Sequence, residues 1–114
     1  MKKDNLVYIE DILKSCNQIA VYITNVKYEE LIENQMMVDA IIRNIEVIGE
    51  AANKLDNDFK VQNPAFPFRS VITMRNKLIH NYNEIDFKVV WDTVKLDVPE
   101  LRIMCEDLLQ SNKL

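Results

Sequence analysis

The chain contains a single histidine, His80, and an arginine, Arg75, lies five positions before it. Imidazole has an ordinary pKa of about 6.5 and can therefore take or give a proton near neutral pH. A guanidinium group can bind a phosphate through two parallel hydrogen bonds and stabilise negative charge that develops on it. Together, these two types of side chain suit acid–base chemistry at a phosphate group.

The spacing alone does not bring the two side chains together. Residues 75 and 80 of a continuous helix differ by about 140° around its axis, so they converge only through the long arginine side chain or at a helix that ends near Ile79. Asn76 lies one helical turn before His80 and can orient the imidazole or contact a ligand. A histidine in the last turn of a helix also interacts favourably with the helix dipole, and this structural role stays open as an alternative.

Positive charge is concentrated around this pair, although the whole chain has a formal net charge of −4. The window from Phe59 to Asn83 has no acidic residue, and its basic residues are Lys60, Arg69, Arg75 and Lys77. The field at a site depends mainly on charges within a Debye length of about 8 to 10 Å, so this window can bind phosphate in an acidic protein. The alternative is a solvated helix face that lacks acidic residues by chance.

The composition excludes several kinds of site and favours long helices. The chain has 114 residues with one glycine and three prolines, whereas phosphate-binding loops and dinucleotide-binding turns need several glycines. Few turn-forming residues predict few short connections, and hence a single all-α domain over residues 1–114. The sequence has no apolar run typical of a membrane span or a signal peptide, which predicts a cytoplasmic protein without a membrane partner.

The two cysteines, Cys16 and Cys105, have no C-x-x-C spacing and no neighbouring histidine. We therefore expect buried, reduced thiols rather than a disulfide, a zinc site or a nucleophile. Neither a metal nor a cofactor is predicted.

Apolar residues recur at intervals of three and four along most of the chain, which predicts amphipathic helices. The first helix begins after Asp4 or Asn5 and continues to about Val26. The elements expected next are a short helix at Tyr28–Ile32, a long helix at Gln35–Leu55 and an irregular connection at Asn57–Pro67. They are followed by a helix from Phe68 to about Ile79, a polar turn at Asn81–Glu84 and a helix capped by Asp86 that runs through Val94. Pro99 interrupts that last pattern, so Pro99–Leu109 is either a kinked continuation or a separate final helix.

Charged residues of alternating sign follow one face of the long helix: Asp39, Arg43, Glu46, Glu50 and Lys54. The pairs Asp39–Arg43 and Glu50–Lys54 place the acid four residues before the base, which favours a ladder of ion pairs worth a few tenths of a kcal/mol each. A metal site or an acid–base pair at Glu46 and Glu50 is the less favoured alternative.

Several motifs follow one another along nearly the whole chain, and the central one is Arg75-x-x-x-x-His80-x-Tyr82. It resembles the hallmark R-x(4–6)-H of the HEPN superfamily, and the motifs together resemble the HepT-like branch of that superfamily. The matching residues elsewhere are Asp39-Ala40-x-x-Arg43, Ile48-Gly49-Glu50-Ala51, Pro64 and Pro67 before it, with Phe68 following Pro67, and Asp86, Trp91-Asp92 and Leu96-x-x-Pro99-x-Leu101 after it. Phe68 and Asn81 depart from the family pattern, where Trp and small residues such as Gly are frequent, but neither is a functional position of the motif.

This resemblance implies a four- to five-helix up-and-down bundle of HEPN type that forms a symmetric homodimer or a higher oligomer. It implies a metal-independent endoribonuclease that acts on RNA without a cofactor and is the toxin of a toxin–antitoxin pair. The implied antitoxin is a nucleotidyltransferase of the MNT type, which adenylylates the motif tyrosine, here Tyr82. An AMP group on Tyr82 would add charge and bulk beside the cationic residues and compete with RNA.

The resemblance also implies a role for each motif residue. Arg75 would bind the scissile phosphate and His80 would act as general acid or base. Asn76, Lys77 and Arg69 are expected to bind RNA or its flanking phosphates. One histidine supplies only half of the usual pair of proton-transfer groups, and a two-fold dimer would supply two, because it brings the same patch of both subunits together.

Two interpretations without catalysis stay open. The first is a helical module that binds a nucleotide or presents Tyr82 to a nucleotidyltransferase. The second is a purely structural dimerisation domain, in which Arg75 and His80 contribute only to stability. By residue type alone, Tyr82 is a half-buried aromatic residue that follows a helix end.

Overall fold

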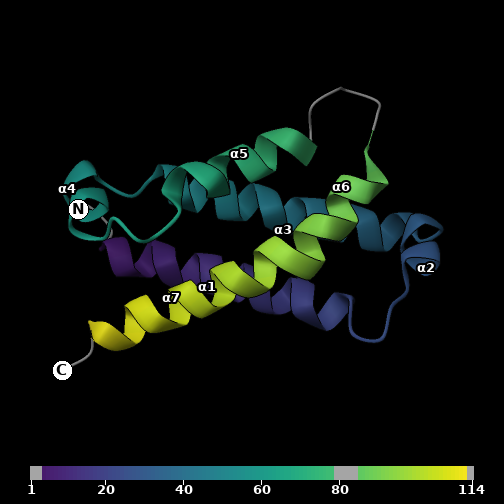
Figure 1. The fold of residues 1–114 in the computed structure, drawn as a ribbon, viewed down its shortest axis with the longest axis horizontal. Coiled ribbons are helices and arrows are strands. Elements are labelled where there is room, and N and C mark those ends of the chain that lie inside the picture. The colour runs from purple at the N-terminus through teal and green to yellow at the C-terminus, as the bar shows by residue number, and fades with distance from the viewer. Residues whose placement is uncertain (1–3, 79–84, 113–114) are drawn as a thin grey trace.

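The structure is a computed structural model that describes residues 4–78 and 85–112, except for the side chains of Ser70 and Arg75. Every regular element in these ranges is helical, which confirms the predicted all-α fold (Figure 1). In chain order the elements are α1 (Asn5–Tyr22), α2 (Tyr28–Ile32), α3 (Gln35–Asn53), α4 (Asn57–Gln62), α5 (Phe68–Leu78), α6 (Phe87–Asp92), the π-helical turn η1 (Thr93–Asp97) and α7 (Val98–Ser111). None of these helices is long and apolar enough to cross a membrane.

The long elements form an up-and-down bundle. Helix α3 packs against both α1 and α5, and α7 packs against α1. Figure 1 shows that α1, α3, α5 and the run from α6 to α7 alternate in direction. The short helix α2 joins α1 to α3 and contacts α6, where Tyr28 meets Trp91 edge to face with ring centroids 5.7 Å apart.

Side-chain caps fix the beginnings of the helices where the sequence predicted them. A carboxylate oxygen of Asp4 accepts a hydrogen bond from the backbone N–H of Leu6, and Asp86 accepts from the first turn of α6. Helix α2 has the predicted bounds, and α3 ends two residues before the expected Leu55. Helix α1 ends before the expected Val26, because Asn25 adopts a left-handed backbone conformation with φ of 58°, which is incompatible with a continuing helix.

The prediction of an irregular connection at Asn57–Pro67 was wrong, because α4 occupies its first half. Asp56 caps the beginning of this helix, and its carboxylate accepts a 2.8 Å hydrogen bond from the backbone N–H of Phe59. The carboxylate of Asp56 also accepts a 2.9 Å hydrogen bond from the side-chain amide of Asn5, and this bond connects α4 to the start of α1. No residue of α4 is fully buried, so the periodicity of apolar residues did not reveal this helix.

The last helical segment is a distorted continuation of α6, one of the two alternatives predicted around Pro99. The backbone N–H of Val98 donates to the carbonyl of Thr93, five residues earlier, and η1 joins α6 to α7 without a break. Proline has no N–H to donate, and its ring clashes with the carbonyl four residues before it. A wider π-helical turn just before Pro99 accommodates both effects.

The core lies between α1, α3, α5 and the α6–α7 run, and aliphatic side chains dominate it. The largest fully buried side chains are Ile9, Ile12, Ile19, Leu31, Ile41, Ile45, Ile48 and Leu78. Cys16 and Cys105 are buried free thiols, as predicted, and burial raises the pKa of each to about 12.

The predicted ladder of ion pairs on α3 is not formed. Among the described residues, neither Asp39 with Arg43 nor Glu50 with Lys54 is within 4 Å. The carboxylate of Asp39 instead accepts a 2.8 Å hydrogen bond from Gln35, one turn earlier. Charge spacing alone does not show that the side-chain amide of Gln35 competes with Arg43 for this carboxylate.

Candidate functional site

Helix α5 carries most of the predicted site. Its buried residues Val71, Met74 and Leu78 face the core at helical spacing. Thr73, Asn76 and Lys77 lie between them and are exposed. The rings of Phe66 and Phe68 lie 4.7 Å apart at its beginning and fix the chain there. This packing holds α5 against α3 and determines which of its side chains solvent can reach.

The predicted residues divide into those the structure describes and those it does not. Arg69, Asn76 and Lys77 are exposed on α5. Arg75 lies within α5, but its side chain falls outside the described atoms. His80 and Tyr82 lie outside the described residues, as does the predicted polar turn at 81–84.

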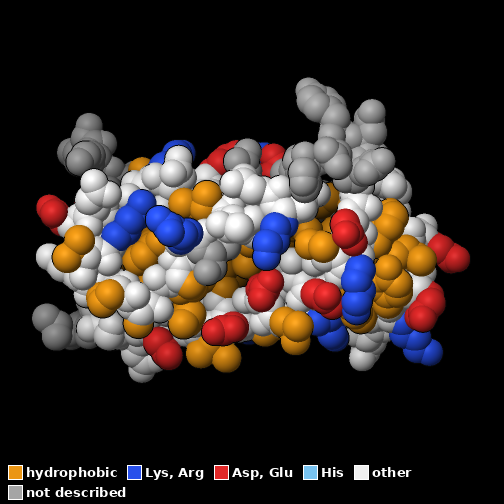
Figure 2. Space-filling view, turned by 45° about the horizontal axis from the view of Figure 1, so that its top comes forward, with side chains coloured by type: hydrophobic (Ala, Val, Ile, Leu, Met, Phe, Trp, Pro, Cys, Tyr) orange, Lys and Arg blue, Asp and Glu red, His pale blue; other side chains and the backbone are white. Residues whose placement is uncertain are grey.

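A groove of about 430 Å³ separates α5 from η1 and α7. Its lining residues are Pro67, Arg69, Val71, Thr73, Met74 and Lys77 on one side and Thr93, Asp97, Glu100, Leu101 and Met104 on the other. We call this the α5–α7 groove. In the left and centre of Figure 2, basic side chains lie above acidic ones on this face, with hydrophobic side chains between them.

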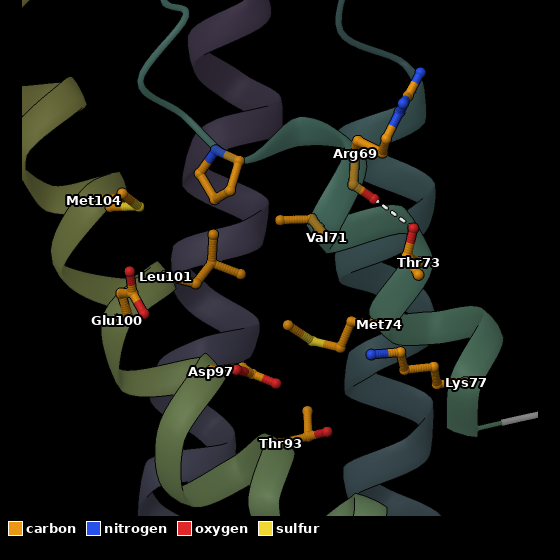
Figure 3. A pocket seen from close by; sticks show the side chains of 11 residues that line it. Arg69, Val71, Thr73, Met74, Lys77, Thr93, Asp97, Glu100, Leu101 and Met104 are labelled. Carbon is orange, nitrogen blue, oxygen red and sulfur yellow. Dashed lines mark hydrogen bonds between the residues drawn. The ribbon is translucent and has the colours of Figure 1, made fainter.

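The basic window of the sequence is therefore not a purely basic surface. The close view in Figure 3 shows the ammonium group of Lys77 and the carboxylate of Asp97 pointing into the groove from opposite walls, whereas the guanidinium of Arg69 points away. Within the described residues no ion pair closer than 4 Å crosses the groove. Asp97 and Glu100 are distant from the window in sequence, so the charge count along the chain missed them.

Thr93 is a further groove residue that the sequence did not indicate. It is only 4% exposed, and its hydroxyl has no hydrogen-bond partner in the described part of the chain. The hydroxyl of Thr73, across the groove, donates to the carbonyl of Arg69 at 2.8 Å (Figure 3). Thr93 begins the π-helical turn, a distortion often found at functional sites, and Pro99 was the only signal of it.

The helical register of α5 separates the groove from the motif arginine. Positions 73 and 77 line the groove, and position 75 is about 200° around the helix from each of them. Lys77 and the backbone of Arg75 therefore belong to different flanks of α5. The two predicted phosphate ligands, Arg69 and Lys77, are eight residues apart, about 12 Å along the axis.

The protein is thus an all-α up-and-down bundle whose basic window spans α4 and α5. Within this class, the sequence pattern of the family described as "Ribonuclease HepT-like" matches residues 12–108, and the chain belongs to that family. The resemblance inferred from the sequence motifs is thus confirmed.

Curated relatives agree with this assignment. A "putative RNase" of Methanocaldococcus jannaschii is 37% identical over 109 residues, which cover 96% of this chain and 90% of the relative. A second one from the same organism is 39% identical, over 89% of this chain and 93% of the relative. A "probable ribonuclease HepT" of Thermococcus cleftensis is 38% identical, over 95% of this chain and 98% of the relative. No solved structure matches the chain.

Proposed function

We propose that the protein is a metal-independent endoribonuclease and the toxin of a HepT/MNT-type toxin–antitoxin pair. The observation that carries this proposal is the family match over residues 12–108, which includes the whole Arg75-x-x-x-x-His80-x-Tyr82 motif. The ribonuclease names of the relatives support the same activity. The anchoring of α5 in the core supports a fixed position for the backbone of Arg75.

The proposed reaction needs no group beyond RNA and the protein. The 2′-oxygen attacks the adjacent phosphorus, the bond from phosphorus to the 5′-oxygen breaks, and a 2′,3′-cyclic phosphate and a 5′-hydroxyl result. One imidazole accepts the proton of the 2′-hydroxyl, and a second one donates a proton to the leaving 5′-oxygen. The guanidinium of Arg75 stabilises the additional charge on the phosphoryl oxygens.

Two imidazoles require two copies of the chain, because His80 is the only histidine. In a two-fold symmetric homodimer each subunit contributes the same surface, so both copies of Arg75 and His80 can reach one cleft. Asn76, next to Arg75 and exposed, and Lys77 contact the bound RNA in this proposal. Arg69 contacts the strand farther along α5.

Regulation of the proposed toxin acts on Tyr82. A nucleotidyltransferase partner esterifies its hydroxyl with AMP, and the resulting phosphodiester and nucleoside occupy the place of the RNA. Intact mass measurement after co-expression with such a partner tests this step. We expect the addition of one or more AMP residues to the parent chain and none to Tyr82→Phe.

Cleavage assays on purified variants test the activity itself. His80→Ala and Arg75→Ala should each lower the rate of RNA cleavage at least about a hundredfold, the usual contribution of a general acid–base or an oxyanion-binding group. Lys88→Ala, which removes an exposed cation paired with Asp92, serves as the matched control and should keep the parent rate. Equal cleavage by His80→Ala and the parent would contradict the proposal, and tight nucleotide binding without cleavage would favour the non-catalytic module.

A further inference from the structure

The α5–α7 groove has the features of a ligand site that the folding of the chain does not require. Lys77 and Asp97 point into it from opposite walls (Figure 3), yet they form no ion pair within 4 Å in the described structure. Unlike charges held apart across a cavity can each bind a different group of one ligand. The volume of about 430 Å³ lies in the usual range for small-molecule sites, roughly 300 to 1,000 Å³.

A buried hydroxyl without a partner points to the same cavity. Thr93 lines the groove and is 4% exposed, and no described residue accepts or donates a hydrogen bond at its hydroxyl. Buried polar groups almost always have a partner, since an unsatisfied one has lost its hydrogen bonds to water without replacement. A ligand atom that accepts a hydrogen bond would satisfy it.

The remaining walls suit a flat, polarisable ring. Met74 and Met104 line the groove from α5 and α7. Thioether groups make favourable contacts with aromatic rings. A ligand that fits this groove has an aromatic ring, hydrogen-bond donors for the carboxylate of Asp97 and an acceptor for Lys77 or Thr93. A nucleobase has all three features.

We propose that the α5–α7 groove binds a guanine base of the RNA substrate and that Asp97 determines this preference. Guanine is the one common base with two adjacent N–H donors, at N1 and N2, which match both oxygens of a carboxylate. Its O6 lies next to them and accepts from the ammonium of Lys77 or the hydroxyl of Thr93. Adenine and cytosine place an acceptor beside their amino group, and uracil has a single N–H between two carbonyls, so each leaves a carboxylate oxygen without a donor.

This inference rests on the ribonuclease function proposed above and adds a subsite to it. Because position 75 lies about 200° around α5 from position 77, the guanine is not held on the flank of α5 that carries Arg75. The groove therefore selects which part of an RNA binds, whereas Arg75 and His80 cleave a bond elsewhere on the strand.

Methyl signals of the methionines can report binding at the groove directly. Met74 and Met104 line it, whereas Met36 is 82% exposed at the start of α3 and serves as an internal reference. In protein labelled with ¹³C at the methionine methyl groups, titration with 5′-GMP should shift the signals of Met74 and Met104 but not that of Met36. AMP, CMP and UMP should bind at least about tenfold more weakly, the lower range for loss of a bidentate base contact.

Variants assign the preference to Asp97. Asp97→Asn turns one acceptor into a donor and should weaken GMP binding at least about tenfold, while Thr93→Val should weaken it less. Asp107→Asn removes an exposed carboxylate of α7 that does not line the groove, and this variant should bind GMP like the parent. Circular dichroism on each variant confirms that the helices are intact.

An uncleavable 2′-O-methyl oligouridylate with one guanosine distinguishes an RNA base from a free nucleotide. It should shift the same two methyl signals, and the all-uridine oligomer should not. The inference is wrong if AMP binds as tightly as GMP, if Asp97→Asn binds GMP like Asp107→Asn, or if only free GMP and not the oligomer occupies the groove. The ribonuclease function would survive each of these results, since it depends on the loss of cleavage in His80→Ala.

Discussion

Thr93 is the single side chain whose burial supports the proposed ligand site most directly. Its hydroxyl is buried in the π-helical turn and has no partner among the described residues. Nothing in the pattern of apolar residues distinguishes such a threonine from one that binds the carbonyl of the preceding turn. Thr73, which does bind the carbonyl of Arg69, has the same residue type and an ordinary role.

The stability of Thr93→Val follows from this difference. Valine keeps the shape of the side chain and removes the unsatisfied hydroxyl, so we expect the free energy of unfolding in the absence of ligand to rise by about 1 kcal/mol. Thr73→Val, the matched control, removes a satisfied hydroxyl and should lower it by a few tenths to about 1 kcal/mol. Urea denaturation of both variants gives the comparison, and a loss above 1 kcal/mol in Thr93→Val would show that the hydroxyl is already bound.

The two buried thiols make a prediction about pH. Burial raises the pKa of Cys16 and Cys105 from the ordinary 9.0 to about 12, so the folded state keeps protons that the unfolded state loses. Stability from this source is complete below pH 9 and falls as the pH rises toward 12.

A thiol reagent provides the corresponding measurement. At pH 8 both thiols should react with a disulfide reagent only after unfolding, because the thiolate is the reactive form. The single variants Cys16→Ser and Cys105→Ser separate the two sites. Rapid reaction of either cysteine in the native protein would contradict the burial.

At the scale of the helices, sequence predicted most of what depends on local spacing and caps. Asp86 begins α6 as expected, because an aspartate side chain can satisfy free N–H groups of the first turn. Helix α4 escaped prediction because it buries no side chain fully and is fixed by Asp56 and Asn5, which are far apart in sequence. The π-helical turn was indicated by Pro99 only as one of two alternatives.

The cap at Asp86, six residues after His80 in the sequence, fixes the beginning of α6. Asp86→Ala should lower the free energy of unfolding by about 1 kcal/mol, since it removes acceptors for the N–H groups of Lys88 and Val89. Asp92→Ala removes only an exposed ion pair with Lys88 and should cost at most about 0.5 kcal/mol. Equal losses in thermal or urea unfolding would contradict the role of the cap.

At the scale of the whole molecule, the groove could not be predicted, because packing of the bundle brings its walls together. Lys77 and Asp97 are twenty residues apart, and their approach across the groove depends on the positions of α5 and α7 in the bundle. The net charge of −4 and the basic window therefore tell which charges the chain carries, but they do not tell which of these charges lie next to one another on the folded surface. The motif itself, in contrast, was recognisable from its resemblance to the HepT-like family, which the family match confirms.

The central proposal is that two subunits combine their histidines in one ribonuclease site, and mixing of subunits tests it most directly. Parent protein and His80→Ala are denatured together, refolded in equal amounts and assayed for RNA cleavage. If one site needs both histidines, only parent homodimers are active. The activity then falls to about one quarter of that of the same total amount of parent protein. A fall to one half would show that each subunit acts with its own histidine, and it would contradict the composite site.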